Sequence, residues 1–371
     1  MILITCIFLV YCILIITFIV GNLRLRREKQ IFVSTRKTSV SVIIPFKNEV
    51  SNLPLIFNSL KSQNYPSELC EIIFVDDYSS DDGFKHITEL IKKDGLFKLV
   101  KNEFEQGKKY ALEYGIQRAK NDLILTSDAD CTFGENWIDS MVAVLESKNA
   151  HLVVGPVKLE TDLSLIGSLI QLEFSALIAS TSGAIGIGKA FMCNGANLAF
   201  SKKLFLDLNP FNTNSKHASG DDVFLLHKIK SVFSKSASIH FANHSNALVS
   251  SKTAIDFKQF IHQRLRWAGK SVSYKDGFSI FVGFIVFLTN LALLLSLITW
   301  LLGFISASMF LVFFLVKWLI DYLLLNSVET WIRPKKSFFY SFLLSFFYPF
   351  YIVSIALLSL LIQPEWKGRK I

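Results

Sequence analysis

The 371-residue sequence has few charged residues and few cysteines, and each shortage excludes a class of protein. Only 19% of the residues are charged while 51% are hydrophobic, a balance too apolar for a purely soluble protein. The five cysteines show no ligand spacing, and Cys6 and Cys12 lie in the first apolar run. The sequence therefore indicates neither a zinc site nor a disulfide framework.

Two common nucleotide-binding loops are also missing. No G-x-G-x-x-G follows the first predicted strand, so the sequence lacks the phosphate loop of a dinucleotide-binding fold. The run 183–189 resembles a G-x-x-x-x-G-K loop, but Ala190 replaces the Mg²⁺-binding hydroxyl and no apolar strand precedes the run. We therefore expect a flexible loop there.

Long apolar runs lie towards both ends of the chain. Met1–Val20 is long enough to cross a bilayer, and it has neither the basic start nor the small-residue cleavage site of a signal peptide. Further membrane helices are predicted near 278–302, 306–326 and 338–362, although Pro349 would allow the last to be re-entrant or interfacial. Within 306–326, Lys317 and Asp321 can pair, which leaves open a transport path or a snorkelling lysine.

The positive charge of +9 is concentrated beside these apolar runs. We therefore expect the basic segments to bind anionic lipid headgroups and not nucleic acid. The basic residues place the segments that carry them on the cytoplasmic side of a membrane, expected to be a bacterial inner membrane. They are Arg24, Arg26, Arg27, Lys29, Arg36, Lys37, Arg333, Lys335 and Lys336.

Between the apolar ends, short apolar runs alternate with helical patterns. Strands are predicted at 41–45, 71–75, 97–100 and 122–126, with helices before Gln63 and over 108–118. This alternation is typical of an α/β fold with a mostly parallel sheet, whose ligands bind at the carboxyl ends of the strands.

Two aspartates follow the fourth predicted strand. Asp128 and Asp130 are two residues apart, so an extended chain would point both carboxylates the same way. Such carboxylates at the carboxyl end of a parallel strand form a hard-oxygen site for Mg²⁺ or Mn²⁺, which usually takes further ligands from a diphosphate. The alternative is a solvated acidic loop.

Five segments in this order resemble a membrane-bound family 2 glycosyltransferase of the GT-A fold, which is a Rossmann-like domain. The resemblance covers roughly residues 41–270, and the ordered set is far more specific than any one motif. The segments are Pro45-Phe46-Lys47-Asn48-Glu49, Val75-Asp76-Asp77, Ser127-Asp128-Ala129-Asp130, Gly220-Asp221-Asp222 and Gln263-Arg264-Leu265-Arg266-Trp267.

The resemblance implies roles on the donor side. Asp130, with Asp128, would hold the metal, and Asp128 would also approach the sugar or ribose. Asp77 would bind the uracil or ribose. The other residues expected at the nucleotide are Pro45, Asn48, Glu49, Lys108 and Gln263.

The resemblance also implies a catalytic set. Asp222 matches the family's base, and Asp221 stands where the family more usually has glutamate. Arg266 would bind the diphosphate and Trp267 would contact the sugar or acceptor. The run 193–197 looks like the acceptor-side loop. The Arg266-Trp267 pair lies on an amphipathic pattern over 254–271, which could instead be a purely interfacial helix.

We therefore expect an inverting hexosyltransferase that moves a sugar from a nucleotide-sugar, most simply UDP-linked, to a lipid or lipid-linked acceptor at the cytoplasmic face. The expected division is an anchor (1–21), a GT-A domain (38–253), an interfacial helix (254–276) and a membrane region (277–371). A processive polysaccharide synthase, a non-catalytic membrane scaffold and a transporter are the alternatives. The sequence names neither the sugar nor the acceptor.

Overall fold

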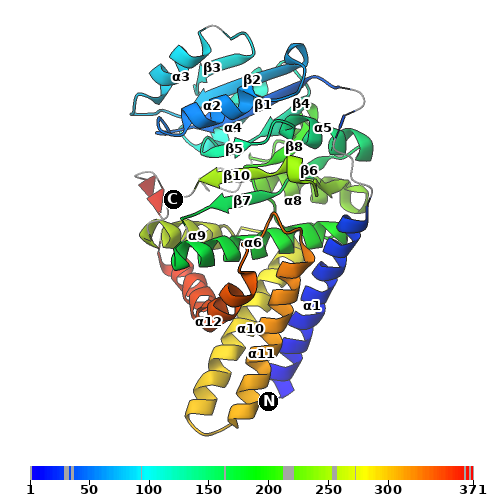
Figure 1. Ribbon diagram of the computed structural model, residues 1–371, viewed down its shortest axis with the longest axis vertical. Helices are drawn as coiled ribbons and strands as arrows, with labels where there is room; N and C mark the ends of the chain where they lie inside the picture. Colours follow the sequence, from blue (N-terminus) through cyan, green and yellow to red (C-terminus); the bar gives the residue numbers. More distant parts are fainter. Residues whose placement is uncertain are drawn as a thin grey trace. The chain divides into compact units, whose positions relative to one another are not determined.

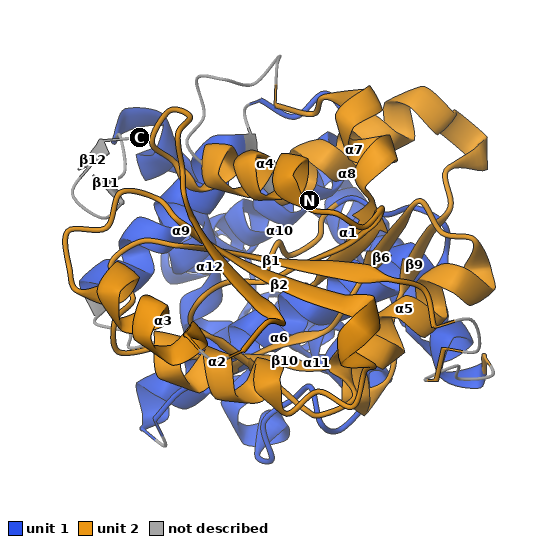
Figure 2. Cartoon of the chain, turned by 90° about the horizontal axis from the view of Figure 1, so that it is seen from above, with its two compact units in different colours: residues 1–27, 161–191, 254–371 blue, residues 28–160, 192–253 orange. Residues whose placement is uncertain are grey.

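The computed structural model describes residues 2–28, 33–34, 37–92, 94–162, 164–211, 221–252, 257–271, 273–362, 365–366 and 369–370. The chain forms two compact units, coloured separately in Figure 2. Unit 1 comprises residues 1–27, 161–191 and 254–371, and unit 2 comprises residues 28–160 and 192–253. Each unit is described by itself.

A seven-stranded sheet forms the centre of unit 2, in the order β3-β2-β1-β4-β8-β6-β9. The run β3-β2-β1-β4 is parallel, and β8 pairs antiparallel with β4 and β6. Every residue of β1 and β2 is buried, as expected of a strand covered on both faces. The strands are β1 (Val40–Phe46), β2 (Cys70–Asp76), β3 (Phe97–Lys101), β4 (Leu123–Thr126), β6 (Leu152–Val154), β8 (Leu198–Ser201) and β9 (Ile239–Phe241).

Helices and a second, three-stranded sheet complete unit 2. The small sheet has the order β5-β10-β7, with β5 (Cys131–Phe133), β7 (Val157–Glu160) and β10 (Val249–Lys252). Ser201 caps α7 by accepting a hydrogen bond from the Leu204 amide at 3.2 Å. The helices are α2 (Leu53–Lys61), α3 (Gly83–Ile91), α4 (Lys108–Arg118), α5 (Trp137–Lys148), α7 (Lys202–Leu208) and α8 (Asp221–Phe233), with short 3₁₀ turns at Ser67–Leu69, Ser234–Ser236 and Ser245–Ala247. The mixed α/β fold predicted from the sequence is confirmed.

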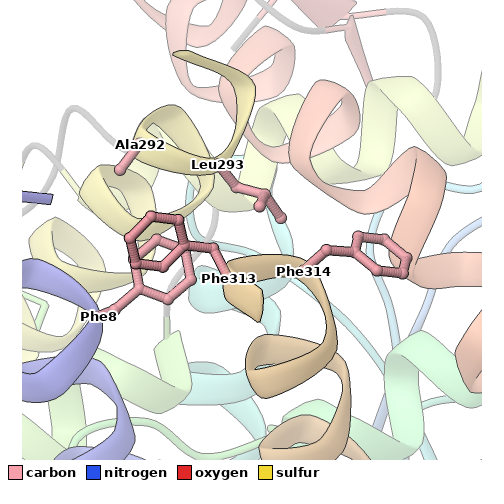
Figure 3. Packing of buried hydrophobic residues seen from close by; sticks show 5 residues of the cluster. All are labelled: Phe8, Ala292, Leu293, Phe313 and Phe314. Carbon is pink, nitrogen blue, oxygen red and sulfur yellow. The ribbon is translucent and has the colours of Figure 1, made fainter. Parts of the chain in front are cut away.

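The described part of unit 1 consists mainly of helices, with two short strands, β11 (Glu365–Trp366) and β12 (Arg369–Lys370). Its helices are α1 (Ile2–Arg27), α6 (Leu165–Gly186), α9 (Phe257–Ser271), α10 (Gly277–Leu301), α11 (Ala307–Ser327) and α12 (Ser337–Leu361). The helices α1, α10 and α11 run side by side (Figure 1). Phe8 of α1 packs there against Phe313 of α11, with Ala292 and Leu293 of α10 in the same cluster (Figure 3).

Among the described residues, five helices of unit 1 are long and apolar enough to cross a membrane: α1, α6, α10, α11 and α12. The predicted terminal helices are confirmed, and Pro349 lies inside a continuous α12. Asp276 and Ser306 cap α10 and α11 by accepting hydrogen bonds from the amides of Ser279 and Met309, which explains where these helices begin. The orientation in a membrane and the four-part division of the chain stay predictions.

Helix α6 was not predicted from the sequence. The predicted loop at 183–189 was wrong over Gly183–Gly186, because these residues form the last turn of α6. Here α6 lies against α1 backbone to backbone: a Cβ on Gly21 would lie 1.9 Å from the Gly183 carbonyl oxygen, and a Cβ on Gly183 would lie 2.4 Å from the Phe18 carbonyl oxygen. These glycines permit a close helix crossing, as small residues do in membrane proteins.

The Lys317–Asp321 pair is confirmed. Lys317 Nζ lies 2.7 Å from Asp321 Oδ2, and the Tyr11 hydroxyl of α1 donates to Asp321 Oδ1 at 2.5 Å. Lys317 is 3% exposed and its ammonium group faces the rings of Tyr11 and Tyr348 at 5.5 and 5.2 Å. A snorkelling lysine would reach towards water, so this burial instead indicates a polar link between α1, α11 and α12.

Candidate active site

The D-x-D lies where β4 passes into β5. Asp128 and Asp130 are in a turn, not in a continued strand, and the Cys131 amide donates to the Asp128 carbonyl at 3.2 Å. Strand β10 fixes the far side of the turn, because the Lys252 amide donates to the Asp130 carbonyl and Ser251 Oγ donates to Asp130 Oδ2 at 3.3 Å. Backbone and side chain of Asp130 are thus both anchored.

Negative charge is concentrated at this turn. Burial, followed by the charges of Asp128 and Glu49, raises the pKa of the Asp130 carboxyl to about 6, although the Lys108 ammonium opposes the shift. Lys108 Nζ itself lies 2.5 Å from Asp128 Oδ1. The charge of Asp128 thus acts on the Asp130 carboxyl, and the role of the two aspartates at a metal stays a prediction.

This donor set fits a hard divalent cation. Carboxylates held close together at a buried position repel one another, and a cation would relieve that repulsion. Within the described residues, no group of three His, Cys, Asp or Glu side chains has the geometry of a complete metal site. A cation held by Asp128 and Asp130 would therefore need further ligands, such as water or diphosphate oxygens.

Several residues expected at the nucleotide follow neighbouring strands of the large sheet. Pro45 is buried in β1, and Asn48 follows that strand with a φ of 53°. Asn48 Oδ1 accepts from the Ser80 amide at 2.8 Å, which ties the loop after β1 to the loop after β2. Glu49 accepts from Asn52 Nδ2 at 2.7 Å through Oε2.

Asp77, at the end of β2, is 2% exposed and held in one orientation. Its Oδ1 accepts from Asn102 Nδ2 at 3.1 Å and from the Gly107 amide at 2.8 Å. Gly107 has a φ of 150°, a left-handed value that favours glycine, and Lys108 begins α4 directly after it. One short loop thus positions both Asp77 and Lys108.

The predicted base, Asp222, is linked to the strand that carries the D-x-D. Its Oδ2 accepts from the Gly195 amide at 3.0 Å, and its Oδ1 accepts from the Val223 amide at 2.8 Å. The Gly195 carbonyl accepts from Thr126 Oγ1 at 3.1 Å, and Thr126 ends β4. Gly220 lies outside the described residues, as does the side chain of Asp221.

One residue of the predicted acceptor-side loop, Asn197, stabilises the loop itself. Asn197 is completely buried, and its side-chain nitrogen donates to the carbonyls of Pro156 and Ala247, both at 2.8 Å. Its Oδ1 accepts from Trp137 Nε1 at 3.0 Å. Asn197 therefore stabilises the loop, which presents Gly195 to Asp222.

The predicted residues Gln263, Arg266 and Trp267 lie on α9 in unit 1. Gln263 Oε1 accepts from Arg264 Nη1 at 2.7 Å, and the Trp267 ring lies 6.3 Å from the Phe174 ring of α6. Their roles at the nucleotide and acceptor stay predictions. Residues 253–256, at the start of the predicted amphipathic segment, lie outside the described residues.

Sequence reasoning missed four residues that support these sites. Thr126 joins the D-x-D strand to Gly195, and Asn102 orients Asp77. Arg264 pairs with Glu173, and that glutamate lies in the unpredicted helix α6. A charged residue inside a 22-residue apolar helix was the signal that could have revealed Glu173.

The known proteins to which this chain is similar include glycosyltransferases. Residues 41–208 match the model of glycosyl transferase family 2. The glycosyltransferase AglE of Haloferax volcanii is 33% identical over 121 residues, 32% of this chain and 39% of that protein. The poly-beta-1,6-N-acetyl-D-glucosamine synthase of Staphylococcus epidermidis is 27% identical over 177 residues, 47% of this chain and 42% of that protein.

A third relative, the undecaprenyl-phosphate 4-deoxy-4-formamido-L-arabinose transferase of Proteus mirabilis, is 31% identical over 147 residues, 39% of this chain and 44% of that protein. The matches thus span less than half the length of these relatives. The solved structure of a Pyrobaculum calidifontis mannosyltransferase, in complex with GDP-Man and Mn²⁺, shares the fold with a TM-score of 0.62 and 16% identity, covering 96% of this chain and 99% of that one. Residues 41–208 of this chain form a glycosyl transferase family 2 domain.

Proposed function

We propose that the protein is an inverting glycosyltransferase that moves a sugar from a UDP-linked donor to a lipid or lipid-linked hydroxyl at the cytoplasmic face of a membrane. The contacts that join Thr126, Gly195 and Asp222 carry this proposal. They connect a carboxylate that can act as a base to the strand whose end carries Asp128 and Asp130. A base and a diphosphate site must be close together for sugar transfer.

On the donor side, the buried Asp77 is suited to hydrogen-bond the base or ribose of the nucleotide. Asp128 and Asp130 would hold the Mg²⁺ or Mn²⁺. When bound, that cation would neutralise negative charge on the departing diphosphate. Lys108, which already contacts Asp128, adds a positive charge at the same place.

On the acceptor side, Asp222 would take the proton of the attacking hydroxyl. Both of its oxygens accept a backbone hydrogen bond, and each keeps a lone pair for that proton. The acceptor oxygen bonds to the anomeric carbon as the bond to the diphosphate breaks, and the nucleoside diphosphate leaves with the electron pair. One direct displacement inverts the anomeric centre. On the family resemblance, Arg266 would stabilise the diphosphate and Trp267 would contact the sugar or acceptor.

A lipid acceptor is supported by the five helices that could cross a membrane. It is also supported by a relative whose name includes the lipid undecaprenyl phosphate. The relative named as a polysaccharide synthase supports the processive alternative.

The test supplies the reconstituted full-length protein with a radiolabelled UDP-sugar and total membrane lipids, followed by organic extraction. A parallel reaction uses a GDP-sugar, because the similar mannosyltransferase was solved with GDP-Man. Label in a discrete lipid product is expected with the UDP-sugar. Label confined to a long water-soluble polymer would establish the processive alternative, and no transfer from either donor would refute the proposal.

A further inference from the structure

Arg264 is a buried cation at the centre of the Gln263–Trp267 segment. It is 3% exposed, and its Nη2 lies 2.5 Å from Oε2 of Glu173, which is itself 6% exposed. The Tyr351 hydroxyl donates to Glu173 Oε1 at 3.4 Å. This cluster joins α9 to α6 and α12 inside unit 1.

The same guanidinium group contacts both ends of the segment. Its Nη1 donates to Gln263 Oε1 at 2.7 Å, and its central carbon lies 4.2 Å from the centre of the Trp267 ring. It also lies 4.6 Å from the centre of the Phe260 ring. Because Phe260 and Trp267 stand four residues before and three after Arg264, all three side chains share one face of α9.

Burying a charged pair requires partners that repay its desolvation, and arginine suits this position better than lysine. Its planar group can donate to Glu173 and Gln263 while its faces contact aromatic rings. A lysine could keep the charge but would lose the planar stacking. An apolar side chain would fill the space without either interaction.

We propose that Arg264 is a positioning residue: its pair with Glu173 fixes the rotation of α9, and its contact with Trp267 fixes the indole. Arg266 and Trp267 are thereby held in the orientation that sugar transfer uses. What Arg266 and Trp267 do rests on the proposed function, whereas the positioning of Trp267 can be measured without it.

Three variants test the inference in the full-length reconstituted protein. Arg264→Lys keeps the charge, and Arg264→Met removes it. Arg264→Met/Glu173→Met removes both buried charges, which protects the fold if a lone glutamate is not tolerated. The matched control is Arg118→Met, because Arg118 also stacks on an aromatic ring (Tyr114, 3.3 Å) and contacts a glutamate (Glu103, 3.3 Å), but on the surface of unit 2.

The first measurement is turnover and donor binding. We expect each Arg264 variant to lower kcat by about a hundredfold, the effect of a small misplacement of reacting groups. Nucleotide-sugar affinity should change by less than about threefold, because the residues proposed to bind the nucleotide are unaltered. In a Trp267→Ala background, Arg264→Lys should have little further effect. Unchanged kcat, or an equal loss in that background, would overturn the inference.

The second measurement needs no activity. The Trp267 contribution to the fluorescence is the difference between matched proteins with and without Trp267→Phe. Quenching of this contribution by acrylamide should at least double in Arg264→Met/Glu173→Met. It should stay constant in Arg118→Met. Constant quenching in the double variant would also overturn positioning. Absence of transfer by the unaltered protein would instead refute the proposed function, so the two failures are distinct.

Discussion

The substitution Asp222→Asn tests the proposed base most directly. Asparagine has nearly the same shape as aspartate but offers one oxygen acceptor in place of two, and its amide cannot take the acceptor's proton. We expect turnover to fall by roughly a hundredfold to ten-thousandfold, the usual contribution of a positioned base.

The structure allows this loss to be compared with the effect on folding. Asp222 accepts hydrogen bonds from the Gly195 and Val223 amides, and asparagine can keep only one of them. The lost bond should lower the free energy of unfolding by about 1–3 kcal/mol. The expected loss of turnover corresponds to about 3–5 kcal/mol of activation free energy. Folding and turnover must therefore be measured separately.

The assay combines transfer of labelled sugar into extracted lipid, nucleotide-sugar binding and thermal unfolding, each on the purified protein. Asp122→Asn is the matched control. Asp122 also uses both oxygens, accepting from Ser201 Oγ and the Lys203 amide at 2.8 Å each. It precedes β4, whereas the D-x-D follows the opposite end of that strand. It should show similar destabilisation with normal turnover per folded molecule.

Near-normal turnover of Asp222→Asn would refute the assignment, and Asp221 would be the next candidate for the base. A loss of turnover that Asp122→Asn reproduces would show that the effect comes from folding. A large loss of nucleotide-sugar binding would place Asp222 on the donor side instead.

Three further predictions concern the metal and the helices. EDTA should abolish sugar transfer by the unaltered protein, and added Mg²⁺ or Mn²⁺ should restore it. In Asp130→Asn, the added cation should not restore transfer. Full activity in EDTA would disprove the metal assignment. Gly183→Ala should lower the free energy of unfolding by about 1–3 kcal/mol in a detergent melt, because its Cβ would meet the Phe18 carbonyl. Gly283→Ala, whose Cβ would meet nothing within 4 Å, is the control, and equal melts would contradict the close crossing. Lys317→Met should lower the free energy of unfolding by about 3–5 kcal/mol because Asp321 loses its cation. The double variant Lys317→Met/Asp321→Leu should recover that stability. Unchanged stability of Lys317→Met would refute the polar link between the helices.

The C-terminal helices and the parallel strands could be predicted from the sequence almost to their ends. The helix predicted near 278–302 is Gly277–Leu301, because a long apolar run stops sharply and Asp276 is a strong cap. The strand predicted at 41–45 is Val40–Phe46, where buried residues form an uninterrupted run. In both cases the information is local.

Helix α6 and the support of the site depend on distant parts of the chain. Serines, threonines and Glu173 dilute the apolar pattern of α6, so this helix is much less apolar than α1. The need for glycine in α6 is visible only in the structure, where the backbone of α1 lies against these residues. Likewise, the link from Thr126 through Gly195 to Asp222 joins three separate chain segments, and no spacing rule predicts it.

The glycine contacts between α1 and α6 also have a consequence for biosynthesis. The ribosome makes α1 before β1 to β7 and makes α6 after them. More than a hundred residues are therefore synthesised between α1 and its partner α6. Helix α8, which carries Asp222, is made later still. Pairing of α1 with α6 can therefore begin while the proposed base is still unsynthesised. A bulky substitution at Gly21 or Gly183 should accordingly appear in a cell as rapid degradation of the nascent protein, with little full-length enzyme left to show a defect in turnover.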